Sequence, residues 1–210
     1  MKKVLLIDDH ALLRRGIKSI LKDNYPGISI SEAGNSAQAE TVIGKHNWDL
    51  IILDINLPGR GGLDLLKVIK KRDNNIPVLL LSMYPEVQFA VRGFKAGAAG
   101  YLCKDSAPED LIAAINRIKN GNYFISPSAV KFLTESLTED SDLPPHQKLS
   151  DREYQVFCML ASGKTVSKVA EELSLSVKTI STVRTHILEK MNLKNNTEII
   201  CYAISNQLIM

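Results

Sequence analysis

The chain has 210 residues, of which 45% are hydrophobic and 23% are charged, and this composition is typical of a globular protein with one large or two small domains. Its formal net charge of +3 is too small to indicate a nucleic-acid partner until the position of the charges is considered. The three cysteines are widely separated and lack metal-ligand spacing, so we expect reduced thiols and a cytoplasmic location, with neither a signal peptide nor a membrane-spanning stretch.

Short apolar runs alternate with helical patterns over residues 1 to about 121, as in a parallel sheet covered by helices on both faces. The runs predict five strands, at residues 3–8, 28–33, 49–54, 77–82 and 100–103. Between them, apolar residues recur at helical spacing, first at Leu12, Leu13, Ile17, Ile20 and Leu21. We therefore expect an α/β domain with a five-stranded, parallel, doubly wound sheet of the (βα)5 type.

Charged side chains follow three of these runs. Asp8 and Asp9 come after the first, Asp54 ends the third, and Lys104 follows the fifth. Because the carboxyl ends of parallel strands share one edge of the sheet, these side chains should meet in one crevice. Three carboxylates would repel one another there unless a cation joined them, and Mg²⁺ takes oxygen ligands while keeping water or phosphate oxygens in its other positions. The pattern predicts a magnesium-dependent phosphoryl-transfer site.

Asp54 is the expected nucleophile, because it ends the most apolar run and precedes a loop that could wrap an ion; its attack on phosphorus would give an acyl phosphate. The expected ligands of the Mg²⁺ ion are Asp8, Asp9, Asp54 and a backbone carbonyl near Asn56. Lys104 is expected to pair with a phosphoryl oxygen, and Ser82, which ends its own strand, to hydrogen-bond another. We expect His10 at a helix start rather than on the ion, since Mg²⁺ prefers oxygen.

The set Asp8-Asp9, Asp54, Ser82, Tyr101 and Lys104 resembles the signature of bacterial response-regulator receiver domains. The resemblance implies that a sensor histidine kinase donates a phosphoryl group to Asp54, that Ser82 is drawn toward it, and that Tyr101 turns inward into the space vacated. The surface formed by the fourth helix, fifth strand and fifth helix would then change. It also implies a regulator rather than a turnover enzyme, one that catalyses only its own phosphoryl transfer and slow dephosphorylation.

Residues 122–148 have the composition of a linker. An amphipathic segment from Ser126 to Leu137 predicts a short helix, and residues 138–145 are acidic and interrupted by prolines, as in a tether. We therefore expect a receiver domain over residues 1–121 and a second domain over residues 149–210.

From Leu149 onward the pattern is entirely helical. Ser150 and Glu153 predict a capping box that opens a helix ending near Ala161. A second helix is expected from about residue 165 to 173, and Ser176 should cap a third that runs to about Met191. Two short helices followed by a longer one predict a helix-turn-helix.

The third helix of this region has two distinct faces. Its apolar face carries Ile180, Val183, Ile187 and Met191, and the opposite face carries Lys178, Ser181, Thr182, Thr185 and Glu189. Between residues 178 and 194, four basic residues accompany one acidic residue, so the segment is basic although the whole chain is nearly balanced. Basic groups that flank small hydroxyl side chains are suited to phosphate anchoring around a major-groove contact.

The second half resembles the LuxR-type, four-helix DNA-binding domain through Leu149-Ser150-Asp151-Arg152-Glu153, Gly163-Lys164, Val169-Ala170, Ser176 to Ile180 and Lys190-Met191. Together with the receiver, the resemblance is to the NarL/FixJ group of response regulators. It implies that the third helix enters the major groove and that a fourth, near residues 196–206, supports a homodimer. By position, bases would be contacted by Ser181, Thr182 and Thr185, and phosphates by Lys178 and Lys190.

We therefore expect a two-component response regulator in which phosphorylation of Asp54 controls dimerisation, binding to double-stranded promoter DNA and transcription, with RNA polymerase as a candidate partner. The residues leave two alternatives open. A Mg²⁺-dependent phosphatase of the dehalogenase type would carry an acid two residues after its nucleophile, where this chain has Asn56. A protein-interaction module would use the basic helix to bind a partner protein and would show no salt-dependent binding to duplex DNA.

Overall fold

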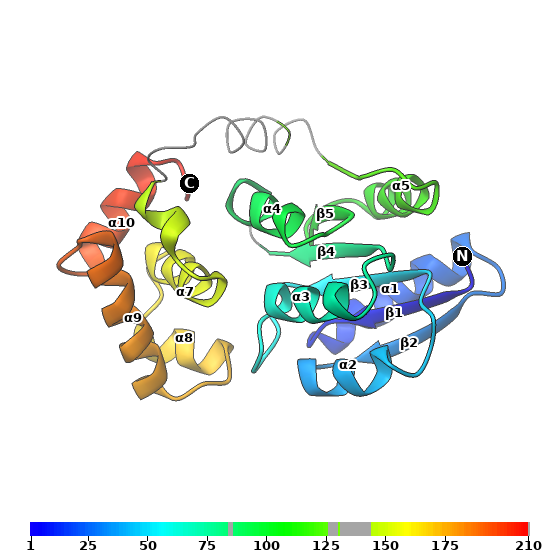
Figure 1. Ribbon diagram of the computed structural model, residues 1–210, viewed down its shortest axis with the longest axis horizontal. Coiled ribbons are helices and arrows are strands. Elements are labelled where there is room, and N and C mark those ends of the chain that lie inside the picture. The colour runs from blue at the N-terminus through cyan, green and yellow to red at the C-terminus, as the bar shows by residue number, and fades with distance from the viewer. Residues whose placement is uncertain (84–85, 126–129, 131–143, 210) are drawn as a thin grey trace. The chain divides into compact units, whose positions relative to one another are not determined.

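The computed structural model describes residues 1–83, 86–125, 130 and 144–209 (Figure 1). Contacts divide the chain into two compact units, Met1–Thr134 and Glu135–Met210, and each is described by itself. The short helix expected over residues 126–137 lies outside the described residues except for Val130, as do residues 138–143 of the expected tether. The boundaries 1–121, 122–148 and 149–210 therefore remain predictions.

The first unit contains a five-stranded parallel sheet with the strand order β2-β1-β3-β4-β5 (Figure 1). The strands are β1 Lys3–Ile7, β2 Ser29–Ala33, β3 Leu50–Asp54, β4 Val78–Ser82 and β5 Gly100–Cys103. All residues of β3 and β4 are buried, which explains why their sequences are continuous apolar runs rather than alternating ones. The predicted fold class and all five predicted strands are confirmed.

Helices connect the strands and cover both faces of the sheet. They are α1 Ala11–Asn24, α2 Ser36–Ile43, α3 Gly62–Arg72, α4 Glu86–Lys95 and α5 Pro108–Lys119. The apolar sides of α1 and α5 pack together on one face, where Ile17, Leu21, Leu111 and Ile115 contact alternate strand residues such as Leu6 and Ile52. Figure 1 shows α2 and α3 on the other side of the sheet from α1. The sheet is therefore doubly wound, as expected.

The site is positioned by the place of β1 between β2 and β3. From β1 the chain adds β2 on one side and then β3, β4 and β5 on the other side. This reversal of strand order opens a crevice at the carboxyl ends of β1 and β3. Ile7 is paired with Leu53, so Asp8, which follows β1, and Asp54, which ends β3, lie side by side at this edge. Asp54 is paired with Leu81 of β4, so the end of β4 lies at the same edge of the sheet.

In the described part of the second unit, residues 144–209, the first helix is the 3₁₀ helix η1, Pro145–Lys148. The α-helices of this part are α7 Asp151–Ala161, α8 Val166–Glu172, α9 Val177–Met191 and α10 Asn196–Ser205. The predicted capping box is confirmed: the Glu153 N–H donates to Ser150 Oγ at 3.3 Å, and the Ser150 N–H donates to Glu153 Oε2 at 2.8 Å. Ser176 caps α9 by accepting from the Thr179 N–H at 3.0 Å.

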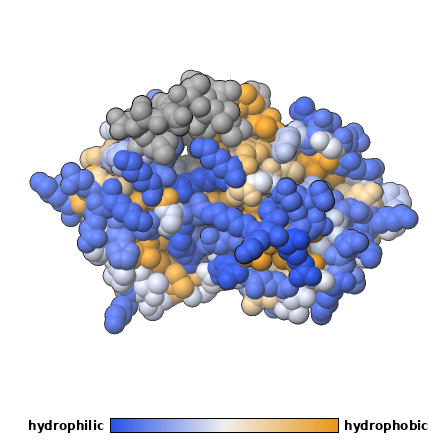
Figure 2. Space-filling model, viewed as in Figure 1, coloured by the Kyte–Doolittle hydropathy of each residue, from blue (hydrophilic) through white to orange (hydrophobic). Residues whose placement is uncertain are grey.

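The surface is mainly hydrophilic on the face shown in Figure 2, with hydrophobic residues exposed in smaller areas. The most exposed large hydrophobic residues among those described include Leu12, Met83, Tyr123 and Ile204. Within the described residues, no helix combines the length and apolar character needed to cross a membrane.

Candidate functional site

The acidic crevice brings together the charged residues that the sequence places at strand ends. Lys104 Nζ lies 2.7 Å from Asp54 Oδ2 and 2.7 Å from Asp8 Oδ2, so one ammonium joins two carboxylates from different strands. Both carboxylates are fully buried and the Lys104 side chain is only 3% exposed, whereas the Asp9 side chain is 31% exposed. Burying these three charged groups costs desolvation free energy, and the short distances between Lys104 and the two carboxylates offset that cost.

Backbone groups fix the orientation of both buried carboxylates. The Asn56 N–H donates to Asp54 Oδ1 at 3.0 Å, and the His10 N–H donates to Asp8 Oδ1 at 2.7 Å. The backbone carbonyl of Asp8 accepts a hydrogen bond from the Arg14 guanidinium at 2.6 Å. The two acidic side chains are therefore held by the turns that follow β1 and β3, not only by each other's charges.

The electrostatics of the crevice raise the pKa of both Asp54 and Lys104. Burial raises the pKa of Asp54, Lys104 opposes this effect, and the neighbouring charge of Asp8 adds to it, so the pKa lies at about 6. Burial by itself lowers the pKa of Lys104, but the charges and hydrogen bonds of Asp54 and Asp8 outweigh it, and the net pKa lies above its usual value. The crevice thus holds more negative charge than Lys104 alone neutralises.

In the metal-free protein, the raised pKa of Asp54 predicts a pH-dependent stability. The carboxyl titrates near 3.8 in the unfolded chain and at about 6 in the folded chain, so between these values the folded state binds more protons. The stability from this group is therefore fully present below about pH 4 and is lost as the pH rises through about 6, by about 3 kcal/mol. Asp54→Asn should remove this dependence. Relative to wild type, its free energy of unfolding should therefore rise by about 1 kcal/mol between about pH 5 and about pH 7.5.

Urea unfolding with a chelator present measures this difference, because Trp48 is the only tryptophan of the chain and is buried in the first unit. Its fluorescence reports the unfolding of that unit. Titrating groups outside the crevice contribute equally to both proteins, so their effects cancel when the variant is compared with wild type at each pH. A difference that stays constant between the two pH values would show that the Asp54 carboxyl has an ordinary pKa.

Four side chains in the crevice could together hold a metal ion. One donor atom from each of Asp8, Asp9, His10 and Asp54 lies within 4.8 Å of every other. Three of the four donors are carboxylate oxygens, which suit hard divalent cations, and their excess negative charge favours such an ion. Asn56, the fourth predicted contributor, lies two residues after Asp54 in the turn after β3 and is half-buried. The acidic residues therefore fit a divalent cation.

The two predicted switch residues lie on β4, which neighbours the strand of Asp54, and on β5, which is the next strand beyond it. Ser82 ends β4 and is fully buried, and its carbonyl accepts the Lys104 N–H at 2.7 Å. Tyr101 lies in β5, where it is paired in register with Leu80, and is 1% exposed. The ring therefore already lies inside the protein, beside the strand that carries Ser82.

Gly62 is a positioning residue that sequence reasoning missed. It begins α3, and its N–H donates to the Ile55 carbonyl at 2.9 Å. A Cβ atom at this position would lie 2.1 Å from the Asp54 carbonyl oxygen and 2.7 Å from Ile55 Cα. The sequence shows only a pair of glycines typical of a turn, because the close approach of α3 to the end of β3 is a tertiary contact.

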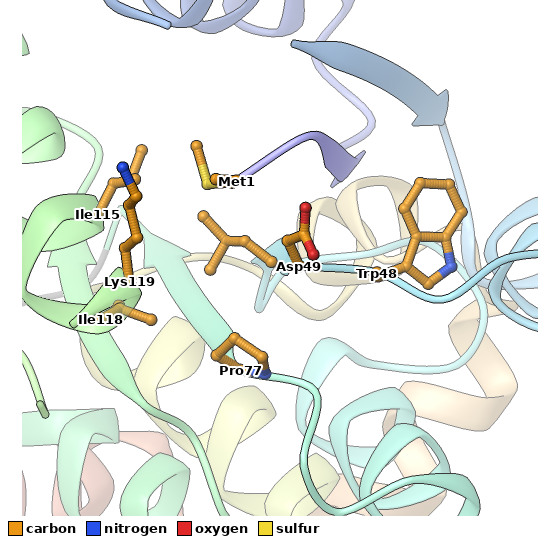
Figure 3. Close-up of a pocket in the computed structure, with 8 residues that line it drawn as sticks. Met1, Trp48, Asp49, Pro77, Ile115, Ile118 and Lys119 are labelled. Carbon is orange, nitrogen blue, oxygen red and sulfur yellow. The ribbon is translucent and has the colours of Figure 1, made fainter. Parts of the chain in front are cut away.

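A cavity of about 340 Å³ lies at the opposite edge of the sheet, around the amino ends of β1, β3 and β4 (Figure 3). Its lining includes Met1, Asp49, Pro77, Ile118 and Lys119. The Asp49 carboxylate accepts the N–H groups of Lys2 and Lys3, and these bonds lower its pKa. This cavity is therefore separate from the acidic crevice, and its carboxylate serves to anchor the start of β1.

The predicted nucleic-acid surface lies on α9. The apolar face packs as expected, with Ile180, Ile187 and Met191 buried and Val183 half-buried. The five predicted contact residues are all exposed: Lys178, Ser181, Thr182, Thr185 and Lys190. His186 is exposed on the same helix and was not among the predicted contacts.

Two basic residues of α9 make contacts within the second unit. Lys190 Nζ donates to Glu153 Oε2 at 2.8 Å, the same oxygen that accepts the Ser150 N–H of the capping box. Arg184 Nε donates to Asn196 Oδ1 at 2.5 Å and thereby joins α9 to the start of α10. Lys190 thus ties the end of α9 to the start of α7 while its side chain remains 47% exposed.

Two family models match the chain. Residues 4–116 match the response regulator receiver domain, and residues 147–203 match the bacterial regulatory proteins of the luxR family. The first match covers the sheet, the acidic crevice and Lys104. The second covers the end of η1, all of α7, α8 and α9, and most of α10.

Curated relatives are similar over their whole length. The response regulator UvrY of Escherichia coli is 32% identical over 210 residues, which cover 99% of this chain and 96% of the relative. The oxygen regulatory protein NreC of Staphylococcus epidermidis is 30% identical, with 99% of each chain covered. The response regulator GacA of Pseudomonas aeruginosa is 30% identical, with 100% of this chain and 98% of the relative covered.

Solved structures share the architecture. A LuxR-family response regulator from Aurantimonas is 31% identical with a TM-score of 0.58, over 65% of this chain and 98% of that one. RcsB of Salmonella enterica, solved on the promoter rprA with the phosphomimetic BeF₃⁻, has a TM-score of 0.65 at 22% identity, over 98% of this chain and 100% of that one. The latter similarity shows the fold alone.

Proposed function

The chain belongs to the bacterial response regulators that join a receiver domain to a LuxR-type DNA-binding domain, and from this premise we propose that Asp54 is the phosphoryl acceptor that controls DNA binding. The observation that carries the proposal is the bridge from Lys104 to both Asp54 and Asp8 at 2.7 Å, in the crevice where β1 and β3 end. The receiver is assigned to residues 1–121, the linker to 122–148 and the DNA-binding domain to 149–210.

Phosphoryl transfer needs little covalent chemistry from the protein. A carboxylate oxygen of Asp54 forms the new bond to phosphorus while the bond from phosphorus to the imidazole nitrogen of the kinase histidine breaks, and that nitrogen leaves with the electron pair. Lys104, already 2.7 Å from Asp54 Oδ2, pairs with a phosphoryl oxygen. The burial of Asp54 keeps competing water from the acyl phosphate, so dephosphorylation is slow and the chain is a regulator rather than a turnover enzyme.

The receiver is proposed to use Mg²⁺, held by Asp8, Asp9, Asp54 and the backbone carbonyl of Asn56. When bound, the ion neutralises charge on the phosphoryl oxygens. The support is the oxygen-rich donor set and the shortage of positive charge in the crevice. In the absence of the ion, Lys104 keeps Asp8 and Asp54 together.

Ser82 and Tyr101 are proposed to carry the change away from Asp54. The hydroxyl of Ser82 would donate to a phosphoryl oxygen, and Tyr101 would occupy the space that the serine leaves. Both side chains are buried on adjacent strands, so a shift of one affects the packing of the other. Through β5 the change reaches α4, which contacts that strand.

The second unit is proposed to bind promoter DNA with α9. Ser181, Thr182 and Thr185 present hydroxyl groups that can donate to or accept from base edges, although Thr182 and Thr185 presently donate to carbonyls of the preceding turn at 3.1 Å. Lys178 and Lys190 are assigned to phosphates. A homodimer formed through α10, which exposes Ile204 and Cys201, would bind two half-sites. We propose a cytoplasmic location, where chromosomal promoters lie, and RNA polymerase as a candidate partner.

The proposal is tested by duplex-DNA binding of the full chain with and without Mg²⁺ and beryllofluoride. Binding sites selected from genomic fragments serve as the DNA. We expect beryllofluoride to tighten binding by about 5- to 150-fold, which is the usual range of coupling between two sites. Equal binding under both conditions would overturn the control of DNA binding by the receiver, and salt-independent binding would overturn the assignment of α9 to DNA.

Lys178→Ala should weaken DNA binding at every sequence and reduce its dependence on salt. Loss of one phosphate contact lowers the slope of the logarithm of affinity against the logarithm of salt concentration by about 0.9 for each bound protomer. Affinities measured at several salt concentrations give this slope. Lys22→Ala removes the same charge from an exposed position of α1 and should leave the slope unchanged. If both variants have the wild-type slope, Lys178 does not contact a phosphate.

A further inference from the structure

The imidazole of His10 faces the acidic crevice. Its Nδ1 atom lies 2.7 Å from Asp9 Oδ1 and 3.1 Å from Asp8 Oδ1, while 59% of the side chain remains exposed. His10 immediately precedes α1, as expected for a helix start. The sequence did not place its ring among the donors of the crevice.

The distances around Nδ1 are those between neighbouring ligands of one metal ion. With metal–ligand bonds of about 2.1 Å, adjacent corners of an octahedron are about 3.0 Å apart. The separations of Nδ1 from the two carboxylate oxygens, 2.7 Å and 3.1 Å, bracket this value. The nitrogen therefore needs no large movement to share an ion with Asp8 and Asp9.

The other contacts of the crevice leave these atoms available to an ion. Lys104 binds the Oδ2 atoms of Asp8 and Asp54. His10 contacts the other oxygen of Asp8, Oδ1. The His10 N–H also donates to Asp8 Oδ1 at 2.7 Å, which holds the turn that directs the ring toward the acids. The exposure of the ring lets an ion reach it from solvent without the protein opening.

We infer that His10 is a nitrogen ligand that gives this receiver an affinity for imidazole-accepting divalent ions, such as Co²⁺, Ni²⁺ and Zn²⁺, beyond that of an all-oxygen site. The inference rests on the proposed metal-dependent function of the same crevice. The ion binds between Nδ1 and the Asp9 carboxylate oxygen, in place of the direct contact between them. Mg²⁺, which prefers oxygen, gains little from the imidazole, so His10 determines which ions compete with Mg²⁺.

The test compares Co²⁺ and Mg²⁺ affinities of the full chain by calorimetry, together with the visible absorption bands of bound Co²⁺. His10→Ala should weaken Co²⁺ binding by about tenfold or more, change the absorption bands, and leave Mg²⁺ affinity within about twofold. His10→Asn keeps a side-chain N–H that can donate to Asp9 but provides no imidazole, and should behave like His10→Ala. His186→Ala removes an exposed histidine of the second unit and should leave tight Co²⁺ binding unchanged.

Three results would overturn the inference: unchanged Co²⁺ affinity in His10→Ala, an equal loss of Co²⁺ and Mg²⁺ affinity, or Co²⁺ binding restored by His10→Asn. Trp48 fluorescence confirms that each variant is folded. Failure of the proposed function has a different signature, because wild type would then bind no Mg²⁺ and DNA binding would not respond to beryllofluoride.

Discussion

Asp54→Asn is expected to abolish both the phosphorylation of the chain and the response of its DNA binding to acetyl phosphate or beryllofluoride. The amide lacks the negative oxygen that attacks phosphorus, and its neutral oxygen is a weaker ligand for a metal ion than a carboxylate. The variant should still fold, since the Asn56 N–H can donate to the amide oxygen that replaces Asp54 Oδ1. Any DNA binding that remains should therefore equal that of the unphosphorylated wild type, with or without the phosphodonor.

Intact-protein mass spectrometry measures the phosphoryl adduct, and duplex binding measures the response in the same samples. Asp23→Asn is a matched control, because it makes the same chemical change at an exposed residue of α1 and should respond like wild type. Phosphorylation of Asp54→Asn at the wild-type rate, with a wild-type response, would place the acceptor elsewhere. Loss of the adduct with a retained response would separate DNA control from Asp54.

Gly62→Ala is expected to destabilise the receiver and slow its phosphorylation, although residue 62 has no chemistry of its own. The added Cβ would lie 2.1 Å from the Asp54 carbonyl oxygen and within 3 Å of two further backbone atoms, all parts of the strand end that carries the acceptor. Either α3 or the end of β3 must move. Overpacking of this kind lowers the free energy of unfolding by about 1–3 kcal/mol, and displacement of a reacting group by about 1 Å can slow a reaction by about 100-fold.

Urea unfolding followed by Trp48 fluorescence gives the stability, and the rate of adduct formation with acetyl phosphate gives the second effect. Gly16→Ala provides the control, because a Cβ at that position of α1 meets nothing within 4 Å. It should stabilise the receiver by about 0.5–1 kcal/mol through the helix preference of alanine. If Gly62→Ala has wild-type stability and rate, the approach of α3 to Asp54 does not position the acceptor.

Much of the fold follows from local sequence. The continuous apolar runs of β3 and β4 predict buried central strands, and Ser150 with Glu153 predicts a capped helix start. The strand ends also predict that Asp8, Asp54 and Lys104 meet, because a parallel sheet brings its carboxyl ends to one edge. Most expected helix and strand ends agree with the structure to within about two residues, because caps and runs involve neighbours along the chain.

The rest of the site could not be predicted from these patterns. Sequence reasoning assigned Lys104 to a phosphoryl oxygen, but not to the bridge between two buried carboxylates that it forms here. It treated Gly62 as part of a turn and His10 as a helix start. It assigned Lys190 to a phosphate contact and did not predict the ion pair that this lysine forms with Glu153. In each case the missing partner lies on another element or depends on the direction of a side chain.

The residue pattern is enough to predict which elements form and which face of α9 is exposed, because periodicity depends on residue type and short-range geometry. It also predicts the edge of the sheet that collects the acidic residues, because all strands of a parallel sheet end at one edge. Tertiary structure alone decided the distances that give those residues their chemistry: the two 2.7 Å contacts of Lys104, the raised pKa of Asp54 and the approach of Gly62 to its backbone. These depend on how tightly separate elements pack, and burial strengthens charge interactions only after that packing has excluded water.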